Sequence, residues 1–435
     1  MTDLPPRDAV ANTGANPGDA SHETATETEA EAGSRDAAPA IVANTGEAAQ
    51  PPAQPNGDRG ALIVVVAASV VALLMVLGGS FWAWSALSQS RYNAASIALQ
   101  TQLGAEAVAV HAYDARLADM NSLALRIASV TARPEFTADT SAEAGALRQD
   151  LGVAQPLATA PAATSPDSAD ALPAAGYRPA WQLLGDSEHL EALTRQSQQT
   201  TAQLSSKTTD AKSAEDTLTA AEAAYFSATA TTAEQLIATD TLSNRSVQVP
   251  LIHLIDQARN PSMSLSRDGA FLGSIVDAEA QVRASQATNQ AHQNDPAWSV
   301  RREIEAYARS LSNGIALEFV WAPEVSGLGS GWLSGTAQTF DTDGGYAIIS
   351  LNYSVEDAWT DGLNETDDHA LVAHEVGHTQ IYRCAKLFND PAFAGNQETW
   401  ATAWSISQGF DVEGSGIQAY GRPTDAQIAL AAQCR

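Results

Sequence analysis

Hydrophobic positions are spread unevenly along this chain, and the longest apolar run lies at residues 61–87. The run, ALIVVVAASVVALLMVLGGSFWAWSAL, has no charged residue and exceeds the length of about 20 residues that a membrane-spanning helix needs. A helix buried in a soluble domain is rarely apolar on every face over this length. Phe81, Trp82 and Trp84 gather at one end, as aromatic residues do at a membrane interface. The pattern predicts a single transmembrane helix.

Residues 1–60, which precede this run, are acidic, rich in Pro and almost free of aromatic residues. Such a composition predicts a disordered tail, and its length argues against an ordinary cleavable signal peptide. Arg59 and Arg91 flank the run on either side, so the positive-inside rule does not fix its orientation. Because a short tail before one anchor is the usual signal-anchor layout, we expect a single-pass cell-membrane protein. Its N-terminus would be cytoplasmic and its C-terminal domain extracytoplasmic.

Residues 88–290 are expected to form a mainly helical stalk. Helix-forming residues dominate 92–132 and again roughly 186–241, and an Ala- and Pro-rich loop is expected near 134–183. Two long helices that flank a loop predict an antiparallel helical hairpin, although the heptads of a coiled coil are irregular here. The hairpin either binds a protein partner or only holds the last domain away from the bilayer, and the sequence favours neither interpretation.

The formal net charge of −28, with only three lysines, argues against a nucleic-acid partner. Binding to a phosphate backbone requires clusters of Lys and Arg, which this chain lacks. The acidity is best explained by solubility.

Residues 291–435 differ in character and are expected to form the compact domain. Alternating patterns at 315–322 and 346–354 predict strands, and helical patterns surround them. The fold class is therefore predicted to be α+β, with a small sheet. Six of the nine tryptophans fall in this part of the chain: Trp298, Trp321, Trp332, Trp359, Trp400 and Trp404.

The segment DDHALVAHEVGHTQIYRC at 367–384 contains the pattern H-E-x-x-H. On a helix, residues four apart lie on one face, so His374 and His378 can both reach one metal ion. Glu375 lies beside them, where its carboxylate can take a proton from an activated water. A further acidic residue, Glu398, follows 20 residues later (398 minus 378) on a second predicted helix.

With these residues the sequence resembles the gluzincin branch of the zincin metallopeptidases over about 90 residues, roughly 315–405. The resemblance implies a zincin-like fold in which His374, His378 and Glu398 hold Zn2+ and Glu375 is the general base. It also implies that the strand YAIISLN at 346–352 is the sheet edge along which an extended peptide substrate binds.

Two features depart from that pattern. Many gluzincins place an Asp four residues after the ligand Glu to orient a histidine, and this chain has Thr402 there. The residue that stabilises the transition state is also not evident. Tyr420 is a candidate by residue type alone, and a packed surface tyrosine is the ordinary alternative.

The only two cysteines, Cys384 and Cys434, lie 50 residues apart in this region (434 minus 384). In an oxidising compartment they are expected to form a disulfide, and two unrelated buried thiols are the alternative.

Together these patterns predict a membrane-anchored, extracytoplasmic zinc-dependent peptidase whose substrate is a peptide or protein. A hydrolase of another class that uses the same ligands is also compatible with the sequence. The main alternative is a non-catalytic, envelope-associated interaction protein, with a helical hairpin that binds a partner and a zincin-like domain that no longer cleaves. Glu375 distinguishes the two, because a purely structural metal site has no need of that carboxylate.

Overall fold

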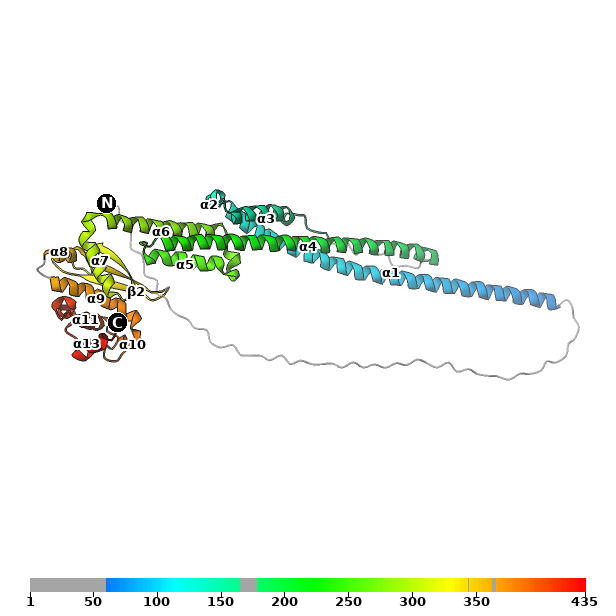
Figure 1. Cartoon of the computed structure of the whole chain (residues 1–435). Coiled ribbons are helices and arrows are strands. Elements are labelled where there is room, and N and C mark those ends of the chain that lie inside the picture. The colour runs from blue at the N-terminus through cyan, green and yellow to red at the C-terminus, as the bar shows by residue number, and fades with distance from the viewer. Residues whose placement is uncertain (1–59, 165–177, 343, 362–364) are drawn as a thin grey trace. The chain divides into compact units, whose positions relative to one another are not determined.

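The computed structural model describes residues 60–164, 178–342, 344–361 and 365–435 (Figure 1). The tail expected at 1–60 lies, except for Gly60, outside the described residues. The chain divides into two compact units, 1–76 and 77–435, and the second contains all that follows except the start of α1.

Helix α1 (Gly60–Thr131) joins the apolar run and the first stalk helix into one continuous helix. Among the described residues it is the one helix long and apolar enough to cross a membrane, and none of its most apolar window is buried within the protein. The exposed side chains here are large and apolar, including Leu74, Met75 and Val76. The helix ends at Thr131, just before Pro134, as Pro is expected to stop it.

The first part of the loop expected near 134–183 is helical instead. Helices α2 (Pro134–Ala138) and α3 (Ala142–Ala158) form there, and the hydroxyl of Ser141 accepts a hydrogen bond from the N–H of Ala144 to cap α3. Their low-complexity composition conceals an apolar face at helical spacing, which packs into the helical core: Leu147, Leu151, Ala154 and Ala158.

Helix α4 (Ala180–Thr239) runs parallel to α1, so the prediction of an antiparallel hairpin is wrong. The pairs that join the two helices ascend together along both: Gln102 with Thr201 at 3.0 Å, Arg116 with Glu215 at 2.7 Å and Arg126 with Glu222 at 2.9 Å. Only a short connection forces consecutive helices to be antiparallel. Residues 132–179 separate these two, which is enough chain to return before α4 begins.

Buried positions on α4 recur at every seventh residue, which is the repeat of a coiled coil. The positions are Leu183, Leu190, Ser197, Leu204, Ala211, Leu218 and Tyr225. Small or polar side chains occupy two of them, and this is why the heptads are irregular in the sequence. Three further elements, which follow α4, complete this helical region: α5 (Arg245–Arg259), η1 (Pro261–Ser266) and α6 (Gly269–Asn294). Residues of α1 to α6 share one hydrophobic core.

The C-terminal domain is built on a three-stranded sheet of order β1-β3-β2. Strands β1 (Ala316–Ala322) and β3 (Tyr346–Asn352) are parallel, and β2 (Gly335–Phe340) is antiparallel to β3. The expectation that 346–352 is the sheet edge is therefore wrong, because β3 is the central strand and β2 is an edge. The described chain is mostly helical with this one small sheet, which agrees with the α+β class in that general sense.

Helices surround the sheet, and two of them carry the residues that the sequence singled out. Helix α9 (Glu365–Arg383) contains H-E-x-x-H, and α11 (Gln397–Ser407) contains Glu398. The other elements are η2 (Pro296–Trp298), α7 (Ser299–Leu311), α8 (Tyr353–Asp361), α10 (Ala385–Phe388), η3 (Glu413–Ser415), α12 (Ile417–Tyr420) and α13 (Asp425–Ala431).

The predicted disulfide is present. Cys384 and Cys434 are joined, with Cα atoms 5.8 Å apart, and Cys434 is buried in the core of the domain. The bond therefore ties the end of the chain to the residue that follows α9.

Candidate metal centre

Helix α9 is held between the sheet and α11, so both the motif and its neighbours are buried. Val372, Ala373 and Val376 are fully buried in the domain, and His374 and Glu375 are each only 3% exposed. A histidine and a glutamate buried to this degree need partners or a task.

Helix α11 approaches α9 closely because Gly377 has no side chain. A Cβ atom at Gly377 would lie 3.0 Å from the Cα of Ala401, and the indole N–H of Trp400 donates to the carbonyl of Gly377 at 3.0 Å. The side chain of Asn396 caps α11 by accepting from the N–H of Thr399. This contact brings Glu398, in the first turn of α11, over the two histidines of α9.

The three expected ligands converge. The Nε2 atoms of His374 and His378 are 3.1 Å apart, and each lies 3.2 Å from the Oε2 atom of Glu398. Two imidazoles and a carboxylate are a donor set that zinc accepts, and ligands about 2.0–2.2 Å from one tetrahedral ion stand about 3.3–3.5 Å from one another. The residues present therefore fit a zinc ion. The two histidines lower the pKa of Glu398 well below its usual range by hydrogen bonding to its carboxylate.

His374 is oriented by a backbone carbonyl that the sequence did not reveal. Its Nδ1 atom donates to the carbonyl of Ser415 at 2.9 Å, so its Nε2 lone pair faces the centre. The hydroxyl of Thr402 is farther from Nδ1, at 3.4 Å. Gly416 follows with φ of 98°, and a Cβ there would lie 2.8 Å from the imidazole. The Ser415 carbonyl thus orients His374, whereas Thr402, at the position where many gluzincins have an Asp, lies farther away; a carbonyl leaves no signal in a sequence.

Glu375 is the unusual member of the group. Burial raises its pKa to about 7, with His374 opposing and Glu398 reinforcing the shift. Its Oε2 atom is buried and has no hydrogen-bond partner among the described residues. Gly335, at the start of edge strand β2, abuts this side chain so closely that a Cβ would lie 2.7 Å from the Cγ of Glu375. Glycine there brings the edge of the sheet against the carboxylate.

The structure also brings Tyr420 to the site. Its ring stacks on the imidazole of His374, with centroids 5.8 Å apart and planes inclined by 9°, while 54% of the residue stays exposed. Partial burial raises the pKa of Tyr420, and the carboxylates of Glu398 and Glu375 raise it further. The phenol therefore keeps its proton and can donate it in a hydrogen bond.

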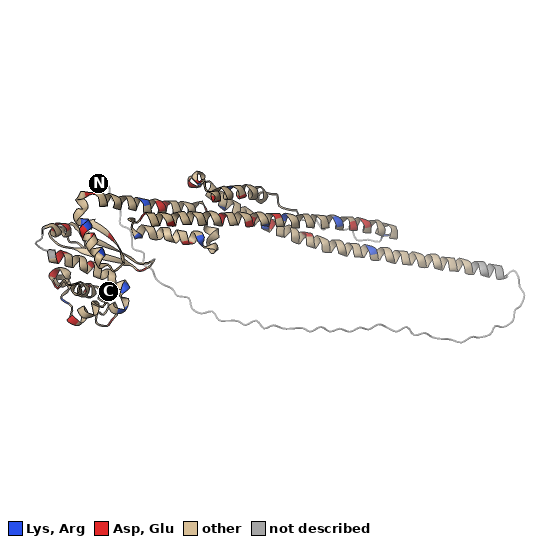
Figure 2. Cartoon of the chain, viewed as in Figure 1, with Lys and Arg blue, Asp and Glu red and all other residues tan. Residues whose placement is uncertain are grey.

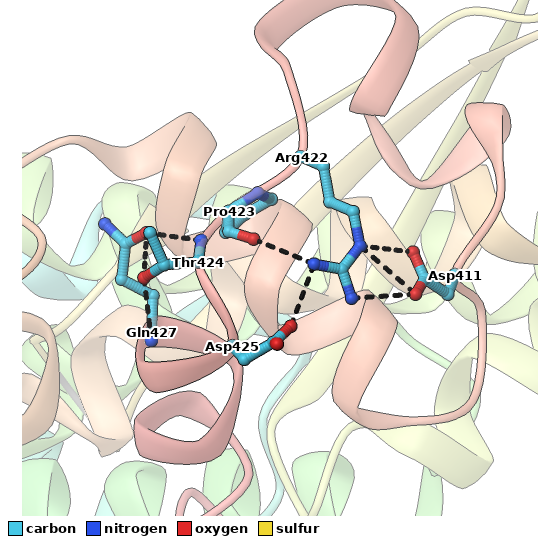
Figure 3. Close-up of polar contacts among 6 residues, drawn as sticks. All are labelled: Asp411, Arg422, Pro423, Thr424, Asp425 and Gln427. Carbon is cyan, nitrogen blue, oxygen red and sulfur yellow. Dashed lines mark hydrogen bonds and ion pairs between the residues drawn. The ribbon is translucent and has the colours of Figure 1, made fainter.

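Arg422 follows the segment that carries Ser415 and Tyr420, and Figure 3 shows its contacts with Asp411 and Asp425. The guanidinium of Arg422 donates to both carboxylate oxygens of Asp411, at 2.9 Å from Nε and 2.9 Å from Nη2, and to Asp425 at 2.9 Å. A paired Thr424 and Gln427 cap the next helix, α13. The ion pair between Asp411 and Arg422 joins the two ends of the loop in which Ser415 and Tyr420 lie.

No family model matches the chain, and no curated protein or solved structure matches it either.

Proposed function

We propose that the C-terminal domain is a zinc-dependent peptidase of zincin-like fold. The observation that supports this most is the meeting of three ligand atoms, 3.1–3.2 Å apart, with a buried carboxylate oxygen of Glu375 that has no partner among the described residues. A structural zinc site normally has four protein ligands, whereas the cluster found among the described residues has three. Three ligands and an adjacent carboxylate suit catalysis.

A zinc ion held by His374, His378 and Glu398 would supply Lewis acidity, which acidifies water and polarises a carbonyl. In this proposal Glu375 accepts the proton of the attacking water and passes it to the leaving amine. Burial raises the pKa of this carboxyl group in the metal-free chain, which favours its acting as the base that accepts the water proton. Tyr420 donates a hydrogen bond to the carbonyl oxygen as negative charge develops there.

The substrate would be an extended peptide or protein segment that adds to edge strand β2. The strand begins beside Glu375, and β2 is paired only with β3 among the described strands, so in this proposal its other edge pairs with the peptide backbone. We also propose that α1 crosses a membrane, with the N-terminus cytoplasmic and the C-terminal domain extracytoplasmic. The disulfide supports that side, because disulfides persist in oxidising compartments.

The test is metal content and peptide hydrolysis of the purified full chain. Wild-type protein should hold close to one zinc per chain and cleave some members of a library of internally quenched peptides. His374→Ala should lose the zinc and the activity. Glu375→Gln should keep the zinc and lose about 10²–10⁴-fold in kcat, since proton transfer is removed while the ligands stay.

A well-folded wild-type chain without metal would contradict the proposal. Metal bound equally by wild type and Glu375→Gln, with no hydrolysis by either, would instead support the non-catalytic interaction protein.

Tyr420→Phe separates the donor role from simple packing. It keeps the ring on His374 and should lower kcat about 10²-fold without loss of zinc, the usual effect of removing one oxyanion donor. Tyr382→Phe, an exposed tyrosine at the end of α9, is the matched control and should leave kcat unchanged. Equal rates for both variants would remove Tyr420 from the mechanism.

A further inference from the structure

The first two turns of α4 lie level with the end of the apolar run of α1. Leu190 of α4 packs with Ala95 and Leu99 of α1, and the guanidinium of Arg178 lies over the ring of Tyr92 at 5.8 Å. Because the helices are parallel, Trp181 stands nine residues before Leu190, about 14 Å closer to the apolar end. Trp181 is therefore within about one turn of the level of Leu87, and Figure 1 shows α4 beginning there beside α1.

Both helices change from uncharged to charged at this same level. On α1, residues 84–90 read WSALSQS and the first charge is Arg91, while on α4, residues 179–185 read PAWQLLG and Asp186 follows. In Figure 2, the start of the described part of α1 carries no blue or red segment. Arg178 does not break the pattern, because its guanidinium pairs with Asp186 at 2.7 Å and so points toward the charged end.

At the start of α4, one face is buried against the neighbouring helices and the tryptophan is on the exposed face. Ala180 and Leu183 are 3% and 5% exposed, whereas Trp181 between them is 62% exposed. On α1, Trp82 and Leu87 are 77% and 62% exposed at a nearby level. Large aromatic side chains that gather at one level around a membrane helix are typical of the bilayer interface, where the ring meets lipid and the N–H meets water.

We propose that the start of α4 is a second membrane contact, with Trp181 inserted in the lipid headgroup region beside Trp82 and Trp84. This inference rests on the membrane crossing proposed above and is independent of the metal centre. The partner is the lipid surface itself, because the uncharged band of α4 continues the apolar run of α1 at the same height. The paired helices would then contact the bilayer at two places, through the apolar run of α1 and through the start of α4.

The experiment uses the full chain reconstituted in phosphatidylcholine vesicles, with and without bromine atoms high on the acyl chains. Bromine quenches only tryptophans that contact the lipid. The emission lost on changing Trp181 to Phe isolates the signal of Trp181, and Trp82→Phe isolates that of Trp82. Trp332→Phe is the matched control, since Trp332 is 57% exposed but lies on the C-terminal domain.

The expected result is that brominated lipid abolishes the Trp181 and Trp82 signals and leaves the Trp332 signal unchanged. A Trp181 signal that persists while the Trp82 signal is lost would overturn this inference and leave the membrane crossing in place; a second copy of the chain covering Trp181 would give that result. Persistence of both signals would overturn the inference together with the membrane crossing.

Discussion

The helical region and the C-terminal domain both bury ionisable side chains, but the buried carboxylates of the two regions differ in whether they have hydrogen-bond or ion-pair partners. In the helical region two buried carboxylates have a partner across the helix pair: Ser197 donates to Glu106 at 2.5 Å, and Arg126 pairs with the Oε2 atom of Glu222 at 2.9 Å. The Oε1 atom of Glu222 has no partner among the described residues, so this carboxylate is paired through one oxygen. In the C-terminal domain, Glu375 is similarly buried but its carboxylate forms no hydrogen bond or ion pair among the described residues. Paired groups of this kind fix a register. A buried carboxylate without a partner, such as that of Glu375, is expected to take part in binding or catalysis.

The largest effect expected on stability concerns the C-terminal domain alone. Replacing both Cys384 and Cys434 by Ser should destabilise it by about 4 kcal/mol, the chain-entropy value for a loop of 50 residues. Hydrogen exchange should accelerate at amides of α9 and α11 and stay unchanged along α4. Equal acceleration in α4 would show that the two regions unfold as one cooperative unit, and the comparison between them would then fail.

The converse change acts on the helical region. Leu218 is fully buried at a heptad position of α4, and Leu218→Ala should cost about 3 kcal/mol through lost contacts and a cavity. Exchange should accelerate along α4, while zinc binding by the C-terminal domain stays the same. The control is Leu125→Ala, because Leu125 is 64% exposed and its loss should cost little. Similar effects from the two variants would contradict the burial of Leu218 in the core of the helical region.

Glu375 gives a pH-dependent test of the unpaired carboxylate in metal-free protein. Its pKa is raised from 4.5 to about 7 by burial, so folding favours the protonated form. The stability that this protonated group contributes is present below about pH 4.5 and is lost as pH rises through 7. Glu375→Gln removes the penalty, so its stability relative to wild type should be about 2 kcal/mol greater at pH 8 than at pH 5.

Chelator-treated proteins, melted across that pH range, provide the measurement for Glu375→Gln. Glu324→Gln, at an exposed position, serves as the control and should show no such change. A stability difference that is flat with pH would mean that Glu375 is not held in the buried state described.

The sequence predicted features that depend on local spacing, and it did not predict features that depend on contacts between distant residues. Local spacing was sufficient for His374 and His378, which one helix places together, and for the end of α1 near Pro134. Glu398 was singled out by its spacing after His378, and its role as a ligand followed from the resemblance to gluzincins. The structure places its carboxylate beside the two histidines. What failed depends on contacts between distant residues: the parallel register of α1 and α4, and the order of the strands. The role of the Ser415 carbonyl in orienting His374 could not be predicted for another reason: every residue type has a backbone carbonyl, so the sequence does not mark this one.

The smallest expected effect tests the register itself. Ser197 occupies a heptad position where an apolar residue would pack better, and its hydroxyl is used by the buried carboxylate of Glu106. Ser197→Ala removes that donor and should cost about 1 kcal/mol, because Glu106 then loses a hydrogen bond. Changing Ser205, an exposed serine one turn beyond Thr201, to Ala should be neutral and controls for helix propensity. If Ser197→Ala instead stabilises the helical region in thermal melts, the hydrogen bond from Ser197 to Glu106 does not set the register of the two helices. The alignment of α1 with α4 would then depend on apolar packing alone.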